Sequence, residues 1–148
     1  MVALQTAPQV QIIPLANPAA TEALAAAYAA RLAPGNVIAL TGDLGAGKTV
    51  FARALIRALG RVSGIDIGHV PSPTFTLVQL YDLVDFTLYH FDLYRLEAPE
   101  EAWEIGIEDA FAGGVSLIEW AGRIEHLLPL HYIGVDLTFG SEETARIA

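Results

Sequence analysis

The residues from Gly42 to Val50, GDLGAGKTV, have the types and spacing that could carry chemistry. They fit the pattern G-x-x-x-x-G-K-[ST], in which Gly47, Lys48 and Thr49 occupy fixed places after the first glycine. Glycines allow successive backbone N–H groups to turn toward one anion, and the start of the following helix adds a positive dipole end. The pattern therefore predicts a phosphate-binding loop (P-loop) that holds a nucleotide.

Two side chains of this loop have separate expected roles. Lys48, the only lysine of the chain, would bring a mobile positive charge to the outer phosphates, and the Thr49 hydroxyl is a ligand for Mg²⁺. The predicted nucleotide-binding segment is the whole loop with the first residues of its helix: Gly42, Asp43, Leu44, Gly45, Ala46, Gly47, Lys48, Thr49 and Val50.

Two carboxylates follow downstream, and a P-loop enzyme needs one near its metal, normally at the end of a neighbouring strand. Asp92 lies in LYHFDLY and Glu119 ends VSLIE. Either could bind the metal directly, bind it through water, or orient an attacking water molecule. Taken alone, Asp92 could be a solvated strand residue paired with Arg95, and Glu119 a charge at a helix start. Beside a P-loop, they favour a catalytic and metal site formed with Thr49, whose individual roles the spacing does not divide.

The segment PSPTFT (71–76) is stiffened by its two prolines and carries three hydroxyl groups, of which Thr74 is the central one. In a nucleotide switch, such a loop becomes ordered around the γ-phosphate and Mg²⁺. An ordinary turn leading into the next strand is the competing interpretation.

Trp120 directly follows Glu119 and could stack on a base or ribose, form part of a partner surface, or pack in the core. The histidines at 69, 90, 126 and 131 show no metal-ligand spacing, and His90 is expected to pack or to make a structural hydrogen bond.

These residues require strands and helices to position them. NVIAL (36–40) predicts a buried parallel strand before the loop, and 48–59 predict the helix after it, closed by Gly60. FTLVQLYD (75–82) and FTLYHFDLY (86–94) predict a hairpin, and VSLIEW (115–120) predicts a further buried strand.

The remaining elements complete an alternating order. They are an edge strand at 9–14, a helix at 21–33 preceded by Asn17 as N-cap and Pro18 at the first helical position, a helix at 98–112 interrupted at Gly106, a short helix at 121–128 and a last strand at 131–139. This order predicts an α/β fold with a mixed sheet.

The amino-acid composition limits which classes of protein the chain can belong to. The chain has 148 residues, 53% of them apolar and 17% charged, which predicts one globular domain over residues 1–148. No apolar run approaches the roughly 20 residues of a membrane helix, the N-terminus has no basic lead, and there are no cysteines. We therefore expect neither a membrane span nor a secretory signal, and a cytoplasmic location.

The net charge is −9, and the arginines are scattered at 31, 53, 57, 61, 95, 123 and 146. A protein that binds nucleic acid directly usually presents a basic face. The charge distribution therefore argues against tight, direct binding of RNA or DNA, although a partner protein could bring the chain to nucleic acid.

Four motifs now stand in a specific order: GDLGAGKT, SPTFTL, HFDLYRL and IEW. In this order, and in a chain this short, the sequence resembles the TsaE family (older name YjeE), small bacterial ATPases that act in the formation of threonylcarbamoyladenosine in tRNA. The resemblance is strong between Pro34 and Trp120 and weaker at both ends. One departure is Ala121, where the family often has proline.

The resemblance implies a three-layer P-loop NTPase-like α/β fold with a mixed, mainly parallel central sheet, and ATP and Mg²⁺ as cofactors. It implies that Thr74 belongs to a switch-like loop, that Asp92 is a metal-site acid, and that Glu119 is the Walker B-like acid. Trp120 would lie near the nucleotide or at the partner surface. The ATPase would be weak alone and would reset the TsaB–TsaD complex between turnovers, so that tRNA is reached only indirectly.

Two other classes of function share the P-loop. A small-molecule kinase would need an arginine-rich lid and an acceptor site, and only Arg95 and Arg123 lie close to the motifs. A nucleotide-gated binding module would change its partner affinity between ATP and ADP with negligible hydrolysis.

Overall fold

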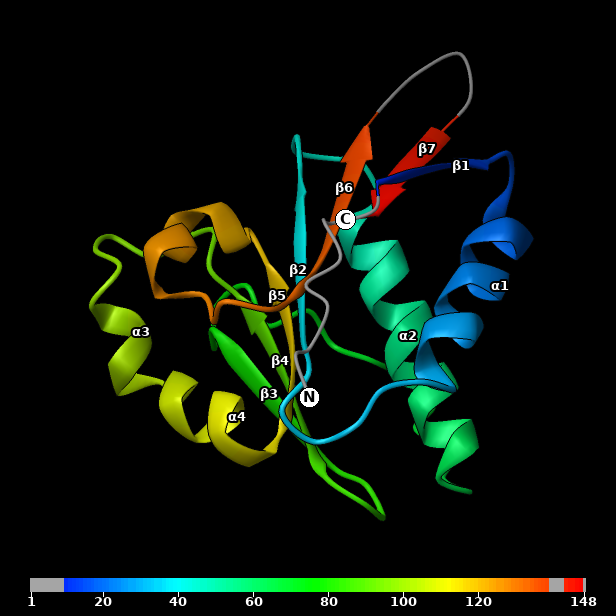
Figure 1. Ribbon diagram of the computed structural model, residues 1–148. Coiled ribbons are helices and arrows are strands. Elements are labelled where there is room, and N and C mark those ends of the chain that lie inside the picture. The colour runs from blue at the N-terminus through cyan, green and yellow to red at the C-terminus, as the bar shows by residue number, and fades with distance from the viewer. Residues whose placement is uncertain (1–9, 139–142, 148) are drawn as a thin grey trace, which may run out of the picture.

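A computed structural model describes residues 10–138 and 143–147 and shows a twisted sheet with helices on both faces (Figure 1). The described strands form one seven-stranded sheet in the order β1-β7-β6-β2-β5-β4-β3. They are β1 (Gln11–Leu15), β2 (Val37–Gly42), β3 (Val78–Asp82), β4 (Thr87–Asp92), β5 (Val115–Glu119), β6 (Ile133–Thr138) and β7 (Glu143–Ile147). The predicted α/β fold with a mixed sheet is confirmed.

The centre of the sheet is parallel. Strands β6, β2, β5 and β4 run in one direction, whereas β3, β7 and β1 pair antiparallel at the two sides. Parallel strands bring their carboxyl ends to the same edge of a sheet. In this sheet the register sets Glu119 of β5 opposite Leu40 of β2 on one side and Asp92 of β4 on the other. The end of the P-loop strand therefore lies beside both predicted acids.

Each face of the sheet has its own apolar core. Helices α1 (Pro18–Ala29) and α2 (Lys48–Val62) cover one face, where the side chains of Leu40, Phe51 and Leu117 are buried together. The helices α3 (Glu101–Glu104) and α4 (Ile107–Gly113) and the 3₁₀ helix η1 (Ala121–Leu127) lie on the other face. Side chains alternate between the two faces along each strand, and this alternation produces the predicted three layers.

The first helix begins as its sequence predicts. The Asn17 side chain accepts a hydrogen bond from the Ala20 N–H at 2.9 Å, and Pro18 occupies the first helical position. The helix ends at Ala29, four residues before the predicted end. Pro34 disfavours helical backbone just before it, and the Asn36 side chain accepts from the Ala33 N–H at 2.9 Å to form a turn.

The end predicted for the P-loop helix was wrong, because α2 continues through Gly60 to Val62. Gly60 is needed because residues 65–67 pack closely against the helix at this position. A Cβ at Gly60 would lie 2.8 Å from both the Ile65 carbonyl oxygen and the Ile67 side chain. Glycine at this position allows the segment after the helix to pack back against it.

The hairpin of β3 and β4 and the break at Gly106 are confirmed, but other boundaries differ. The first hairpin strand starts at Val78 and not at 75, because residues 74–76 form a turn and Leu77 has φ +70°. The strand predicted at 115–120 ends at Glu119, and the edge strand runs to Leu15. Part of the predicted strand 9–14 and of 131–139 lies outside the described residues.

Strand β7 was not expected from the sequence. Only Ala145 and Ile147 are apolar in the segment SEETARI, which is too little for a strand prediction, yet Glu143–Ile147 lie between β6 and β1 and pair antiparallel with both. The segment is extended because its backbone pairs with two neighbouring strands. No local sequence pattern reveals such pairing.

Within the described ranges, none of the helices combines the length and the apolar character needed to cross a membrane.

The close approach at Gly60 predicts opposite effects of alanine at two helical glycines. Gly60→Ala should lower the free energy of unfolding by about 1–3 kcal/mol, because the added methyl group overpacks against the backbone of Ile65. Gly113→Ala is the matched control, since a Cβ at Gly113 meets no atom within 4 Å, and it should be neutral or stabilising by up to about 1 kcal/mol. Urea unfolding followed by circular dichroism measures both, and equal effects of the two substitutions would contradict this account.

Candidate functional site

The P-loop connects the end of β2 at Gly42 to the start of α2 at Lys48. Gly42 has φ +140°, and a Cβ there would lie 2.4 Å from the Leu137 carbonyl oxygen of β6. The first glycine of the motif is thus required both by its backbone conformation and by the neighbouring strand. The loop is thereby anchored at the edge of the sheet, with the N-terminus of α2 facing the same space.

Lys48 lies across the loop that precedes it. Its Nζ donates hydrogen bonds to the carbonyl oxygens of Gly42 at 2.6 Å and Asp43 at 2.7 Å, and it lies 4.0 Å from the centre of the Trp120 ring. Burial lowers the pKa of this ammonium group, while the nearby carboxylates of Glu119, Asp43, Asp92 and Asp136 oppose that decrease. The positive charge is therefore surrounded by carbonyl oxygens, carboxylates and an aromatic face.

Glu119 is buried, with an exposed fraction of 1%, and its two oxygens have different partners. Oε1 accepts a hydrogen bond from the Thr49 hydroxyl at 2.9 Å. Oε2 lies 2.7 Å from the Nε2 atom of His90, a fully buried residue of β4. The carboxylate at the end of β5 thus connects the first turn of α2 to the adjacent strand.

Asp92 lies next to Glu119 at the end of β4. Its Oδ2 accepts from the Thr74 hydroxyl at 3.0 Å, and its Oδ1 accepts from the backbone N–H of Tyr94 at 3.0 Å. The pairing with Arg95 considered from the sequence is not found, since that guanidinium lies 4.8 Å from the centre of the Phe75 ring.

The segment 71–76 reaches the site through Thr74. Its hydroxyl contacts both Asp92 and the Ser72 hydroxyl, the latter at 2.8 Å, while Phe75 beside it is 83% exposed. Residues 74–76 form a turn before β3, and this turn is tied to one of the predicted acids. The conformational switch expected for this segment stays a prediction.

Trp120 has φ +60° and ψ +40°, a left-handed conformation that is rare for a bulky residue. The turn of the backbone places its ring in contact with Lys48 and with Tyr94, whose ring centre is 4.8 Å away. Strained backbone of this kind concentrates at functional sites. The indole therefore forms a wall beside the P-loop, and stacking on a base stays a prediction.

These residues surround a cavity of about 340 Å³ at the carboxyl edge of the sheet. Its lining residues are Leu44, Gly45, Gly47, Lys48, Thr49, Val50, Thr74, Asp92, Tyr94, Glu119 and Trp120. Three of the predicted residues do not line it. Gly42 and Asp43 contribute carbonyl oxygens to Lys48, and Ala46 is buried in the core.

Three residues near this site were missed as site residues in the sequence. His90 was expected only to pack or to make a structural hydrogen bond, and it makes one to Glu119. Tyr94 lines the cavity, and Asp136 of β6 accepts a hydrogen bond from the Thr41 hydroxyl at 3.1 Å. In LYHFDLY, the alternate spacing of His90 and Asp92 was the available signal for His90, because period two places alternate residues on one face of a strand. Tyr94 lies in the turn after β4 and had no such signal.

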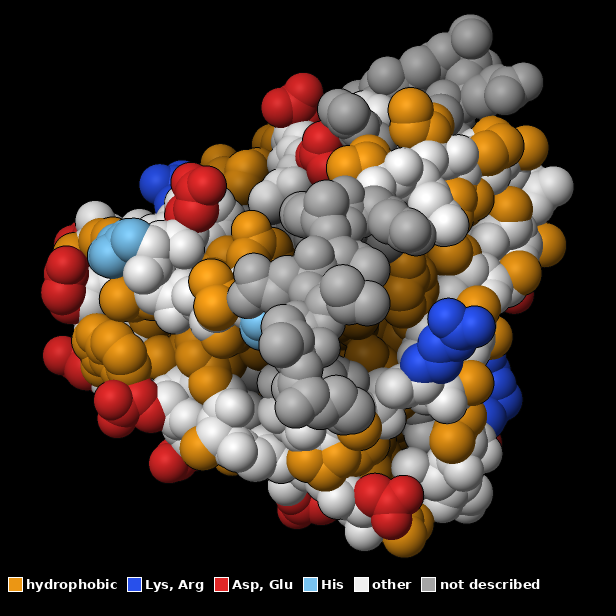
Figure 2. Space-filling view, in the orientation of Figure 1, with side chains coloured by type: hydrophobic (Ala, Val, Ile, Leu, Met, Phe, Trp, Pro, Cys, Tyr) orange, Lys and Arg blue, Asp and Glu red, His pale blue; other side chains and the backbone are white. Residues whose placement is uncertain are grey.

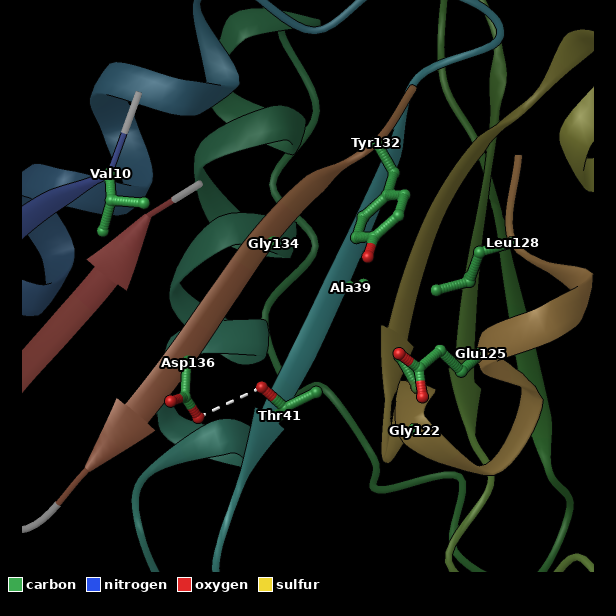
Figure 3. Close-up of a pocket in the computed structure, with 10 residues that line it drawn as sticks. Val10, Ala39, Thr41, Gly122, Glu125, Leu128, Tyr132, Gly134 and Asp136 are labelled. Atoms are coloured by element: carbon green, nitrogen blue, oxygen red, sulfur yellow. Dashed lines mark hydrogen bonds between the residues drawn. The ribbon is translucent and has the colours of Figure 1, made fainter. Parts of the chain in front are cut away.

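A second cavity, of about 360 Å³, lies on the sheet face opposite α2, between η1 and strands β2 and β6 (Figure 3). Its floor is formed by Ala39 and Gly134, and Glu125, Leu128 and Tyr132 lie around it. No residue from 42 to 50 lines it, so it offers no P-loop amide to a phosphate. The first cavity is therefore the candidate nucleotide site.

The surface in Figure 2 carries isolated Lys and Arg side chains and no continuous basic patch, with acidic side chains distributed around its margin. On the face in view, the charge distribution offers no track for a nucleic-acid backbone.

Comparisons with known proteins identify the family of the chain. The family model described as threonylcarbamoyl adenosine biosynthesis protein TsaE matches residues 15–147. Two relatives bear the name tRNA threonylcarbamoyladenosine biosynthesis protein TsaE. The protein from Rickettsia bellii is 48% identical over 117 residues, 79% of this chain and 78% of the relative. The protein from Bacillus subtilis is 45% identical over 132 residues, 88% of this chain and 79% of the relative.

Among solved structures, the crystal structure of Bacillus subtilis YdiB superposes with a TM-score of 0.74 at 30% sequence identity, covering 97% of this chain and 87% of that one. The family match spans both the P-loop and the two strand-end acids, and the superposition covers almost the whole chain. The chain belongs to the TsaE family.

Proposed function

We propose that the chain is an accessory ATPase of threonylcarbamoyladenosine (t⁶A) formation in tRNA, which binds ATP and Mg²⁺ and hydrolyses ATP to drive turnover of the TsaB–TsaD complex in the cytoplasm. The names of its relatives support the pathway. The observation that carries the hydrolytic role is the hydrogen bond between Thr49 of the P-loop helix and Glu119 at the end of β5. This bond unites a phosphate-loop hydroxyl and a buried carboxylate at one point of the cavity.

The oxygen donors of the cavity fit Mg²⁺. Thr49, Asp92 and Glu119 offer a hydroxyl and two carboxylates, the hard ligands that this ion prefers. Among the described residues, no group of three or more His, Asp or Glu side chains is arranged to hold a metal by itself. Mg²⁺ in nucleotide sites is usually bound by one or two carboxylates and completes its shell with phosphate oxygens and water. When bound, the ion would neutralise charge on the phosphates.

The P-loop and Lys48 would bind the phosphates. The backbone N–H groups of the loop and the N-terminus of α2 attract the anion, and Lys48 would exchange its bonds to the Gly42 and Asp43 carbonyls for phosphate oxygens. Glu119 is positioned to accept a hydrogen bond from Thr49 or from a water beside it. Asp92 holds Thr74, so a change at the metal site would be transmitted to segment 71–76.

The cavity also favours hydrolysis over phosphoryl transfer to a small molecule. No arginine is among its lining residues in the described part of the chain, whereas a kinase lid needs positive charge over the phosphates. P-loop hydrolases commonly use an arginine supplied in cis or by a partner, which increases the rate by about 10³–10⁵. A cavity without its own arginine supports weak hydrolysis alone and stimulation by a partner protein.

The test of this function is phosphate release by the purified chain, alone and with TsaB–TsaD and tRNA. We expect slow release alone and strong stimulation by the complex. A phosphorylated small product would favour the kinase. Partner binding that differs between ATP and ADP, without phosphate release even in the complex, would favour the nucleotide-gated binding module.

Lys48→Ala is expected to weaken ATP binding by roughly 10- to 150-fold, because a charge-assisted hydrogen bond to phosphate contributes about 1.5–3 kcal/mol. Isothermal titration calorimetry gives the Kd. Arg57→Ala is the charge-matched control, since Arg57 lies on the same helix, outside the cavity, and its Nε binds the Gly68 carbonyl. Unchanged ATP affinity in the Lys48 variant would contradict the assignment of Lys48 to phosphate binding.

Glu119→Ala and Asp92→Ala should each retain ATP binding and lower kcat by about 100-fold or more, since they remove groups that act on metal or water. The measurement is phosphate release in the presence of the partner complex. Glu125→Ala, which removes an exposed carboxylate outside the site, should leave the rate unchanged. Wild-type rates in both acid variants would refute their roles.

Thr74→Val is expected to lower the free energy of unfolding by about 1–2 kcal/mol, because it removes a hydrogen bond to the charged Asp92. Thr76→Val should change it by less than about 0.5 kcal/mol, since the exposed Thr76 hydroxyl has only a long contact of 3.5 Å with Gln79. Urea unfolding compares them, and a Thr74 variant as stable as the Thr76 variant would show that the tie to Asp92 contributes nothing.

A further inference from the structure

Among the residues that the structure describes, His90 is the one buried imidazole beside the candidate site. The side chain has no exposed surface, lies in β4 two residues before Asp92, and has the carboxylate of Glu119 as its hydrogen-bond partner. Its Nδ1 atom is buried and has no partner. A polar ring kept in an apolar strand, with half of its hydrogen-bonding capacity unused, costs stability. The hydrogen bond to Glu119 offsets part of this cost.

The direction of that bond follows from its partners. A carboxylate oxygen at 2.7 Å accepts, so Nε2 carries the hydrogen. His90 therefore donates one fixed hydrogen bond to Oε2 of Glu119.

We propose that His90 is a positioning residue for the metal site. By occupying Oε2, His90 sets the rotation of the Glu119 carboxylate, so that Oε1 alone faces the Thr49 hydroxyl and the cavity. Without that donor, the carboxylate can rotate about its terminal bond, whose rotamer well is broad. Thr49 would then lose its fixed acceptor. This inference rests on the proposed function, because it concerns the same site.

Removing a side chain that orients a metal ligand typically lowers metal affinity or activity by about 10- to 100-fold. This magnitude sets the size of the effect to look for. A role in packing alone would instead lower stability without changing the dependence on Mg²⁺.

The experiment compares His90→Gln with His90→Leu. The Gln amide nitrogen can occupy the position of Nε2 and donate to Glu119, whereas Leu fills similar volume without a donor. ATP affinity is measured by calorimetry in EDTA and across a Mg²⁺ titration, and kcat and KM are measured by phosphate release with the partner complex. Thermal unfolding reports the loss of packing separately.

For His90→Leu, we expect the half-saturating Mg²⁺ concentration to rise about 10- to 100-fold, with ATP affinity in EDTA unchanged and with kcat affected more than KM. His90→Gln should restore Mg²⁺ dependence to within a few-fold of the wild type. In a Glu119→Ala background, His90→Leu should have no further effect, because the acceptor is gone.

Three results would overturn the inference. They are a wild-type Mg²⁺ dependence in His90→Leu, a Gln variant as impaired as the Leu variant, or an undiminished effect of His90→Leu in the Glu119→Ala background. If the Leu variant does not fold, His90→Asn takes its place, since its amide is too short to reach Oε2. A wild-type chain that binds ATP without any response to Mg²⁺ would instead refute the proposed function, and this inference with it.

Discussion

The site depends on the sharing of one buried carboxylate between two elements. Glu119 receives a hydrogen bond from Thr49 of α2 through Oε1 and one from His90 of β4 through Oε2. With both oxygens occupied, the ends of β4 and β5 are connected to the first turn of the P-loop helix. Because a buried carboxylate without partners is unstable, these two donors are also what allows Glu119 to remain at an exposed fraction of 1%.

The rest of the fold provides the geometry for that arrangement. The parallel pairing of β4, β5 and β2 brings three strand ends to one edge, and apolar cores on both faces hold the strands in register. Helix α2 packs its apolar face, including Phe51 and Leu55, under the sheet and so directs its N-terminus toward the cavity. A shift of one residue in the register would move Glu119 to the opposite face. The position of the Glu119 carboxylate oxygens therefore depends on the apolar packing that holds the strands in register.

Lys48 shows how such a site can be poised for a ligand. Its ammonium group is held by carbonyl oxygens of its own loop and covered by Trp120, in surroundings rich in carboxylates. Phosphate oxygens would offer that charge a stronger acceptor than the carbonyls, since both partners would then be ionised. Binding of a nucleotide would therefore exchange one set of hydrogen bonds for another, with Trp120 directly in contact with the group that moves.

Local sequence patterns determined much of this protein. The P-loop pattern, the alternation of apolar strands, the Asn17–Pro18 helix start and the break at Gly106 were readable because each depends on residues close in the chain. The order of strands and helices was sufficient to predict an α/β fold with a mixed sheet, and the acids Asp92 and Glu119 stood out as charges at the ends of apolar strands.

Contacts between distant residues were decided by the tertiary structure alone. The pairing of β7 with β1 and β6, the use of Gly60 for a close approach, and the bond of His90 to Glu119 across 29 positions have no local signature. Each of them depends on which segments the sheet register and the cores bring together. The sequence alone therefore identified the residue types of the site. The hydrogen-bond partner of each side chain depends on the register of the strands in the folded sheet.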